Sequence, residues 1–136
     1  MAVVARAPAP QAPSRRQQAG RLDLRRRDFL SAGDLTREEL EAALDRAAGM
    51  KAAIRPSPTQ PLAGRTIALL FQKPSLRTRV SFELAVRNLG GEPIHLGQSE
   101  VGLGVRESVE DVGHTLERWV DGVVARTFEQ LVLEQL

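Results

Sequence analysis

The stretch FQKPSLRTRVSFE, from Phe71 to Glu83, follows an almost wholly apolar run, TIALLF, from Thr66 to Phe71. An apolar run of this length that ends near a proline and a serine predicts a strand covered on both faces, as in a parallel sheet. A helix is expected to begin after Ser75 and to end at the pair Gly90 and Gly91. The stretch is therefore predicted to turn the chain from a central strand into the next helix.

This turn has the residue types of an anion site. The first backbone N–H groups of a helix lack partners within the helix, and the helix dipole places positive charge behind them. Ser75 is expected at the N-cap, with Arg77, Thr78 and Arg79 just after it. Guanidinium groups match phosphate oxygens in a bidentate manner, and together with a hydroxyl they can stabilise charge on a carbonyl oxygen. As an isolated pattern it favours an ordinary amphipathic helix start with a surface pair of Arg79 and Glu83, and the preceding buried strand shifts the interpretation to an anion site.

A helix is predicted before the central strand, because Thr36 and Glu39 form a capping box. Its apolar stripe has the spacing of one helical face and consists of Leu40, Ala43, Leu44 and Ala47.

Two further strands are predicted after the motif, at Pro93 to Leu96 and at Gly122 to Arg126. A glycine-bearing loop, Gly97 to Gly104, follows the first of them. The helix between the two strands has an apolar face that we expect in the core, made of Val109, Val112, Leu116 and Trp119. From Phe128 to Leu136 another helix opens without a closing cap.

This alternation predicts an α/β fold, a three-layer parallel sheet with helices on both faces and right-handed crossovers. We expect it to be incomplete at its carboxyl end, because the last helix is not closed. Ligands of such sheets bind at the carboxyl ends of the strands, so the segment Ser75 to Arg79 and Arg126 should face the same site.

Composition restricts the classes of function. The 136 residues suffice for one ordinary domain, and no apolar run approaches the roughly 18 residues of a membrane span. The chain has no cysteine, which excludes disulfides and thiolate zinc sites and is compatible with a reducing cytoplasm. Neither His95 nor His114 has clustered acids beside it, so no metal site is expected.

The first part of the chain is basic, with seven arginines between Arg6 and Arg27 and Asp23 as the only acid among them. Residues 1–24 are predicted to be a disordered leader rich in alanine, proline and arginine. The same composition would also suit a transit peptide or a nucleic-acid-binding arm, although the chain has few aromatic residues for stacking on bases.

The motif KPSLRTRVSFE resembles the signature of the aspartate and ornithine carbamoyltransferases, Ser-Thr-Arg-Thr-Arg followed by Ser-Phe-Glu, and the likeness extends over nearly everything from Arg25 onward. It implies a partial carbamoyl-phosphate-binding domain at residues 25–136, with the second, amino-acid-binding domain absent. The substrate-binding residues that it implies are Ser75, the backbone N–H of Leu76, Arg77, Thr78 and Arg126, of which Arg77, Thr78 and Arg126 would be catalytic.

Two features depart from the family pattern. Leu76 replaces the usual threonine, which removes one hydroxyl. Gly102 stands where many ornithine enzymes carry a glutamine that reaches the site of a neighbouring subunit, and Arg106 stands where some members carry a lysine. Gly102 and Arg106 are therefore only possible site residues.

The resemblance implies transfer of the carbamoyl group from carbamoyl phosphate to ornithine, giving citrulline and phosphate in arginine biosynthesis, without cofactor or metal. The complete enzyme is expected to be a cytoplasmic homotrimer with no nucleic-acid or membrane partner. Ornithine would bind only with the absent domain, so this chain alone should be inactive. The alternatives are transfer to aspartate or another amino acid, or a fragment that binds carbamoyl phosphate or phosphate without catalysis.

Overall fold

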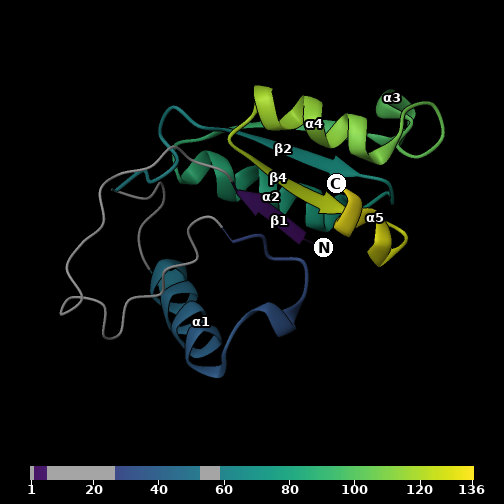
Figure 1. Cartoon of the computed structure of the whole chain (residues 1–136). Coiled ribbons are helices and arrows are strands. Elements are labelled where there is room, and N and C mark those ends of the chain that lie inside the picture. The colour runs from purple at the N-terminus through teal and green to yellow at the C-terminus, as the bar shows by residue number, and fades with distance from the viewer. Residues whose placement is uncertain (1, 6–26, 53–58) are drawn as a thin grey trace.

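The computed structural model of the protein describes residues 2–5, 27–52 and 59–136. Its centre is a four-stranded sheet in the order β1-β4-β2-β3, in which β1 is Ala2–Ala5, β2 is Thr66–Phe71, β3 is Glu92–Gly97 and β4 is Gly122–Arg126 (Figure 1). Strands β3 and β4 both pair with β2 in parallel, whereas β1 pairs with β4 in the antiparallel direction. The three predicted strands and their parallel pairing are confirmed.

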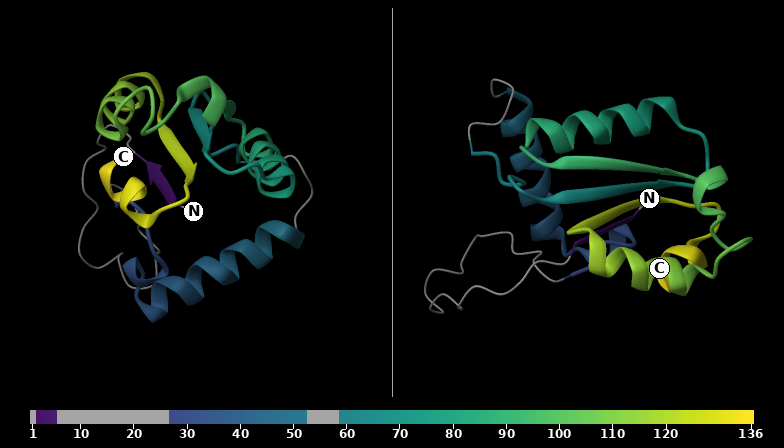
Figure 2. Two further views of the ribbon diagram at one scale, coloured as in Figure 1. Left: turned by 90° about the vertical axis from the view of Figure 1, so that its right-hand side faces the viewer. Right: turned by 90° about the horizontal axis from the view of Figure 1, so that it is seen from above.

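Helices cover both faces of the sheet, as predicted. Figure 2 shows α2 (Leu76–Asn88) on one side of the strands and α4 (Val109–Trp119) on the other. The short helix α5 (Gln130–Gln135) packs on the same side as α4. The remaining helical elements are the 3-10 helix η2 (Ala32–Asp34), α1 (Arg37–Ala52) and α3 (Gln98–Val101).

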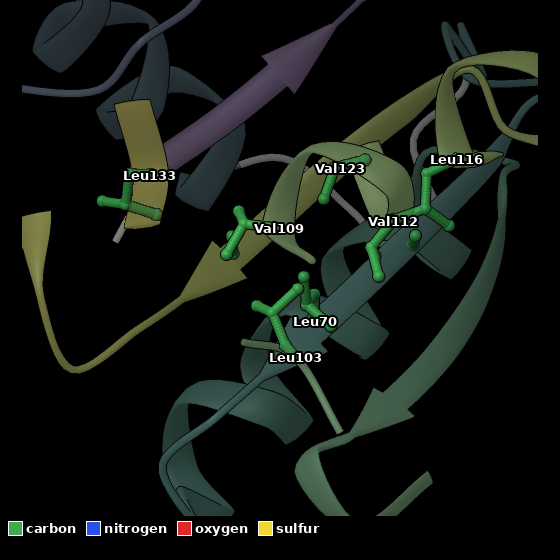
Figure 3. Packing of buried hydrophobic residues seen from close by; sticks show 9 residues of the cluster. Leu70, Leu103, Val109, Val112, Leu116, Val123 and Leu133 are labelled. Carbon is green, nitrogen blue, oxygen red and sulfur yellow. The ribbon is translucent and has the colours of Figure 1, made fainter. Parts of the chain in front are cut away.

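Strand β2 explains why the run TIALLF is apolar after its first residue. Ala68 and Leu70 face the layer of α4, while Leu69 and Phe71 face the layer of α2 and contact Phe82. The larger cluster, shown in Figure 3, joins β2 and β4 to α4, α5 and the loop before α4; its buried members are Ala68, Leu70, Leu103, Val109, Val112, Leu116, Val123, Ala125 and Leu133. Full burial of a leucine contributes about 1.5–3 kcal/mol. This larger cluster therefore contributes more to stability than the cluster of Leu69, Phe71 and Val124 on the other face.

The register brings the carboxyl ends of the three parallel strands to one level. Phe71, the last residue of β2, is opposite Gly97 of β3 and Arg126 of β4. Whatever follows these residues must therefore gather at a single edge of the sheet, where ligands of parallel sheets bind.

Helix α1 begins as predicted, but its apolar stripe is not covered. The Thr36 and Glu39 side chains exchange hydrogen bonds with each other's backbone N–H, at 3.2 and 2.9 Å. The bond from the Thr36 amide and a second from Arg27 lower the pKa of Glu39. Leu44 is 61% exposed, because α1 stands apart from the layers of the sheet (Figure 1). A helical period predicts the helix, whereas the partner of its apolar face depends on the rest of the fold.

Three elements were not predicted, namely β1, the single-turn η2 and α3. Ala2–Ala5 forms the edge strand β1, so the structure departs from the disordered leader at these residues, while residues 6–24 of that leader lie outside the described residues. The sequence AVVA has β-branched valines, and the outer edge of β4 offers backbone groups to pair with. Inside the predicted loop Gly97 to Gly104, Glu100 accepts a hydrogen bond from the backbone N–H of Gly97 at 2.8 Å and so starts α3.

Trp119 was expected in the core, and this prediction is wrong. Its side chain is 75% exposed, because Trp119 is the last residue of α4 and lies beyond Leu116, the last buried residue of that helix.

Candidate functional site

The turn after β2 carries several hydrogen-bond donors that are not used within helix α2. Ser75 is the N-cap of α2, as predicted, and its side chain makes no capping hydrogen bond. The first backbone bond of the helix runs from the Arg79 N–H to the Ser75 carbonyl, at 3.0 Å. The N–H groups of Leu76, Arg77 and Thr78 therefore have no carbonyl in a preceding turn of the helix, as at any helix start. These donors and the Ser75 hydroxyl can bind an anion.

Arg126 enters the same site from the neighbouring strand. It ends β4 opposite Phe71, and its carbonyl accepts a hydrogen bond from the backbone N–H of Gln72 at 2.9 Å. A pocket of about 380 Å³ is lined by Pro74, Ser75, Leu76, Arg77 and Arg126. Four of the five predicted substrate-binding residues thus line one cavity, although the two arginines come from different strand ends.

The charge of this pocket is positive. Among the residues that the structure describes, the ion pairs involve Arg27, Arg37, Arg65 and Arg87, and none of them engages Arg77 or Arg126. Two uncompensated guanidinium groups beside a helix N-terminus attract phosphate and can bind it in a bidentate manner.

The surface pair considered for Arg79 is not the one observed. Glu83 pairs with Arg87, one turn further along α2, at 3.4 Å. Arg79 instead lines a second, larger pocket of about 670 Å³, which shares Pro74, Ser75 and Leu76 with the first. This second pocket also contains Lys73 and His95, and the His95 ring lies 6.0 Å from the ring of Phe71.

Three predicted residues lie outside the lining of the first pocket. Thr78 is half-buried on α2, and its carbonyl accepts a hydrogen bond from the Ser81 hydroxyl at 2.9 Å. Gly102 ends α3 with a left-handed backbone (φ 65°), and its carbonyl accepts the N–H of Arg106 at 2.7 Å. The Arg106 guanidinium turns back to the carbonyl of Glu100. Within this chain Gly102 and Arg106 shape their own loop, and neither lines the first pocket.

The contact between Gln72 and Phe128, beside the site, was not predicted from the sequence. The Gln72 side chain accepts a hydrogen bond from the Phe128 N–H at 3.0 Å, and Phe128 follows Arg126 by two residues. The available signal was a polar residue directly after the last buried position of the central strand.

Other kinds of site find no support in the described ranges. Across residues 2–5, 27–52 and 59–136, no group of three or more His, Cys, Asp or Glu side chains could hold a metal ion. None of the helices in these ranges is long and apolar enough to cross a membrane.

Comparison with known proteins shows which family shares this arrangement. The sequence model described as "Aspartate/ornithine carbamoyltransferase, carbamoyl-P binding domain" matches residues 27–136. A Deinococcus radiodurans protein named ornithine carbamoyltransferase is 49% identical over 110 residues, which are 81% of this chain and 35% of the relative. A Staphylothermus marinus protein of the same name is 44% identical over 117 residues, 83% of this chain and 37% of the relative.

Solved structures agree with the sequence comparison. The crystal structure of ornithine carbamoyltransferase from Thermus thermophilus matches with a TM-score of 0.69 and 43% identity, over 77% of this chain and 36% of that chain. Ornithine carbamoyltransferase from Pyrococcus furiosus matches with a TM-score of 0.66 and 37% identity, over 78% and 34%. The chain spans about a third of the length of these relatives. It belongs to the aspartate/ornithine carbamoyltransferase family, in which it corresponds to the carbamoyl-phosphate-binding domain.

Proposed function

We propose that the pocket between the Ser75 turn and Arg126 binds carbamoyl phosphate, as one half of the active site of an ornithine carbamoyltransferase. The observation that carries this proposal is the pocket itself, which unites Ser75 and Leu76 with the positive charges of Arg77 and Arg126. The phosphate would be held by the Ser75 hydroxyl, the first N–H groups of α2 and the Arg77 guanidinium. Thr78 would add a hydroxyl only after a side-chain movement, because it does not line the pocket.

The reaction needs positioning and charge stabilisation more than it needs a protein nucleophile. The neutral side-chain amine of ornithine attacks the carbonyl carbon, a C–N bond forms, and negative charge develops on the carbonyl oxygen. Collapse of this intermediate breaks the bond between the carbonyl carbon and the phosphate oxygen, phosphate leaves with the electron pair, and the nitrogen loses a proton. Arg126 and Arg77, which both line the pocket, would stabilise the developing charge.

Ornithine is the favoured acceptor because the relatives from Deinococcus radiodurans and Staphylothermus marinus are named ornithine carbamoyltransferase. Since the chain covers about a third of their length, we expect ornithine to bind only in the complete protein. We further propose that the complete protein is a cytoplasmic homotrimer of arginine biosynthesis. Sedimentation of the complete protein would test the trimer, and a monomer at micromolar concentration would contradict it.

Calorimetric titration of carbamoyl phosphate into this chain at low salt tests the proposed site. Wild type should bind saturably, and Arg77→Ala should lose at least about tenfold in affinity, since a charge-assisted bidentate contact is removed. Arg87→Ala is a matched control on the same helix, because it also removes one positive charge but lies at the far end of α2. Equal losses in both variants would show an effect of net charge alone, and absence of binding by folded wild type would overturn the proposal.

A further inference from the structure

Gln72 lies where three segments of the site meet. It is the first residue after β2, and its backbone N–H donates to the carbonyl of Arg126 at 2.9 Å. Its side-chain oxygen accepts the N–H of Phe128 at 3.0 Å. Its side-chain nitrogen makes a longer contact of 3.5 Å with the carbonyl of Leu103, in the loop before α4. Gln72, which follows β2, therefore contacts the last residue of β4, the segment after β4 and the loop before α4.

Lys73 makes a second contact with Phe128. The Lys73 ammonium lies 4.7 Å from the centre of the Phe128 ring, within the range of a cation–π contact. Gln72 and Lys73 thus hold the backbone and the ring of the same residue. Phe128 is 60% exposed, so little other packing fixes it.

These contacts hold Arg126 and the chain directly after it. The carbonyl of Arg126 and the N–H two residues later bind the backbone and the side chain of the same glutamine. Gln72 itself belongs to the turn that leads directly to Ser75. An arginine side chain has many rotamers, so the position of its backbone relative to the ligand determines how many of them can reach the phosphate.

We propose that Gln72 is a positioning residue that holds the segment Arg126 to Phe128 against the Ser75 turn, and so sets the phosphate affinity of the pocket. The inference rests on the proposed function, because it concerns the same pocket. Gln72 does not line the pocket between Arg77 and Arg126, so it acts through Arg126 and not by contact with phosphate.

Gln98 offers a matched control. Its side-chain nitrogen donates to the same Leu103 carbonyl at 3.2 Å, a shorter contact than that of Gln72. Gln98 makes no contact with the segment after β4 among the hydrogen bonds of the described residues, and both glutamines line the second pocket and not the first. Replacing either glutamine with methionine removes the amide and keeps a side chain of similar size. Only the change at Gln72 removes the hydrogen bond from the Phe128 N–H.

The experiment titrates inorganic phosphate into the 136-residue chain and into Gln72→Met and Gln98→Met, with folding checked by circular dichroism. Gln72→Met should bind about five- to tenfold more weakly than wild type, and Gln98→Met should bind as wild type does. Unchanged affinity in Gln72→Met, or equal losses in both variants, would overturn the inference.

Hydrogen exchange of the Phe128 amide provides a second readout that needs no variant. In wild type this amide should exchange slowly despite the exposure of its side chain, and more slowly still when phosphate binds. Fast exchange in wild type, or exchange that saturating phosphate leaves unchanged, would contradict the role of Gln72 even if Gln72→Met does not fold. Wild type that fails to bind phosphate would contradict the proposed function, while the protection of the free Phe128 amide would still test the contact.

Discussion

Asp121 holds the amino ends of β2 and β4 together, at the opposite end of the strands from the phosphate pocket. Its carboxylate accepts hydrogen bonds from the Thr66 backbone N–H at 2.9 Å and from the Arg65 guanidinium at 2.5 Å. Its own N–H donates to the Thr66 carbonyl at 2.9 Å. The hydrogen bond from Thr66, followed by that from Arg65, lowers the pKa of Asp121. The carboxylate is therefore stabilised by folding.

We expect Asp121→Asn to lower the free energy of unfolding by about 1–2 kcal/mol at neutral pH. Hydrogen bonds to charged groups contribute about 1.5–3 kcal/mol when shielded, whereas exposed ion pairs contribute about 0.2–1 kcal/mol. The side chains of Arg65 and Asp121 are 37% and 29% exposed, so the solvent screens this pair and the expected value lies between the two ranges.

The pH dependence of this effect has a definite sign. Because the pKa is lower in the folded chain, the contribution of Asp121 is complete above its unfolded pKa of about 3.9 and is lost as the pH falls through the folded pKa. Asparagine does not titrate in this range. The difference in stability between wild type and the variant should therefore narrow in acid.

Urea unfolding followed by circular dichroism, from neutral pH to about pH 3, measures this difference. Asp45→Asn is the control, because Asp45 lies exposed on α1. A difference below about 0.5 kcal/mol at neutral pH, or one that does not narrow in acid, would refute the reasoning. Phosphate affinity should not change, since Asp121 and the pocket lie at opposite ends of β4.

Three further changes test the core, the pocket and the loop. Leu116→Ala should lower the free energy of unfolding by about 2–5 kcal/mol in the same urea assay, because it opens a cavity among buried residues under α4. Arg126→Lys keeps the charge but loses the planar pair of donors, so calorimetry should show about tenfold weaker phosphate binding with unchanged stability. Gly102→Gln places a Cβ 2.8 Å from that of Arg106 at a positive φ, and thermal unfolding should show a loss of about 1–3 kcal/mol.

Elements that rest on local signals could be predicted from the sequence. The run TIALLF is apolar from Ile67 onward and buried from Ala68 to Phe71, because β2 is covered on both faces, and this alone identifies the central strand. Ser75 and Thr36 precede α2 and α1 as predicted, because N-caps depend on residues within the first turn.

Predictions about what covers an apolar side chain were less successful. The stripe of α1 and Trp119 at the end of α4 have the correct period, yet both are exposed. A period states that a face is apolar, whereas burial requires a second element at the right distance, which depends on chain connections that no local pattern specifies. The pairing of β1 with β4 is of the same kind, because residues at opposite ends of the chain meet.

The residues of the proposed phosphate pocket could be predicted from the order of the elements, whereas the contacts that fix their geometry could not. Right-handed parallel crossovers place the carboxyl ends of neighbouring strands side by side, so the convergence of Arg77 and Arg126 followed from the order of the elements alone. Topology does not fix how firmly the two strand ends hold each other. That depends on single contacts such as Gln72 to Phe128, which are far apart in sequence and have no periodic signal. A phosphate site of this type therefore depends on a predictable crossover for its residues and on an unpredictable side-chain contact for their geometry, which is why a change at Gln72 is the more informative test.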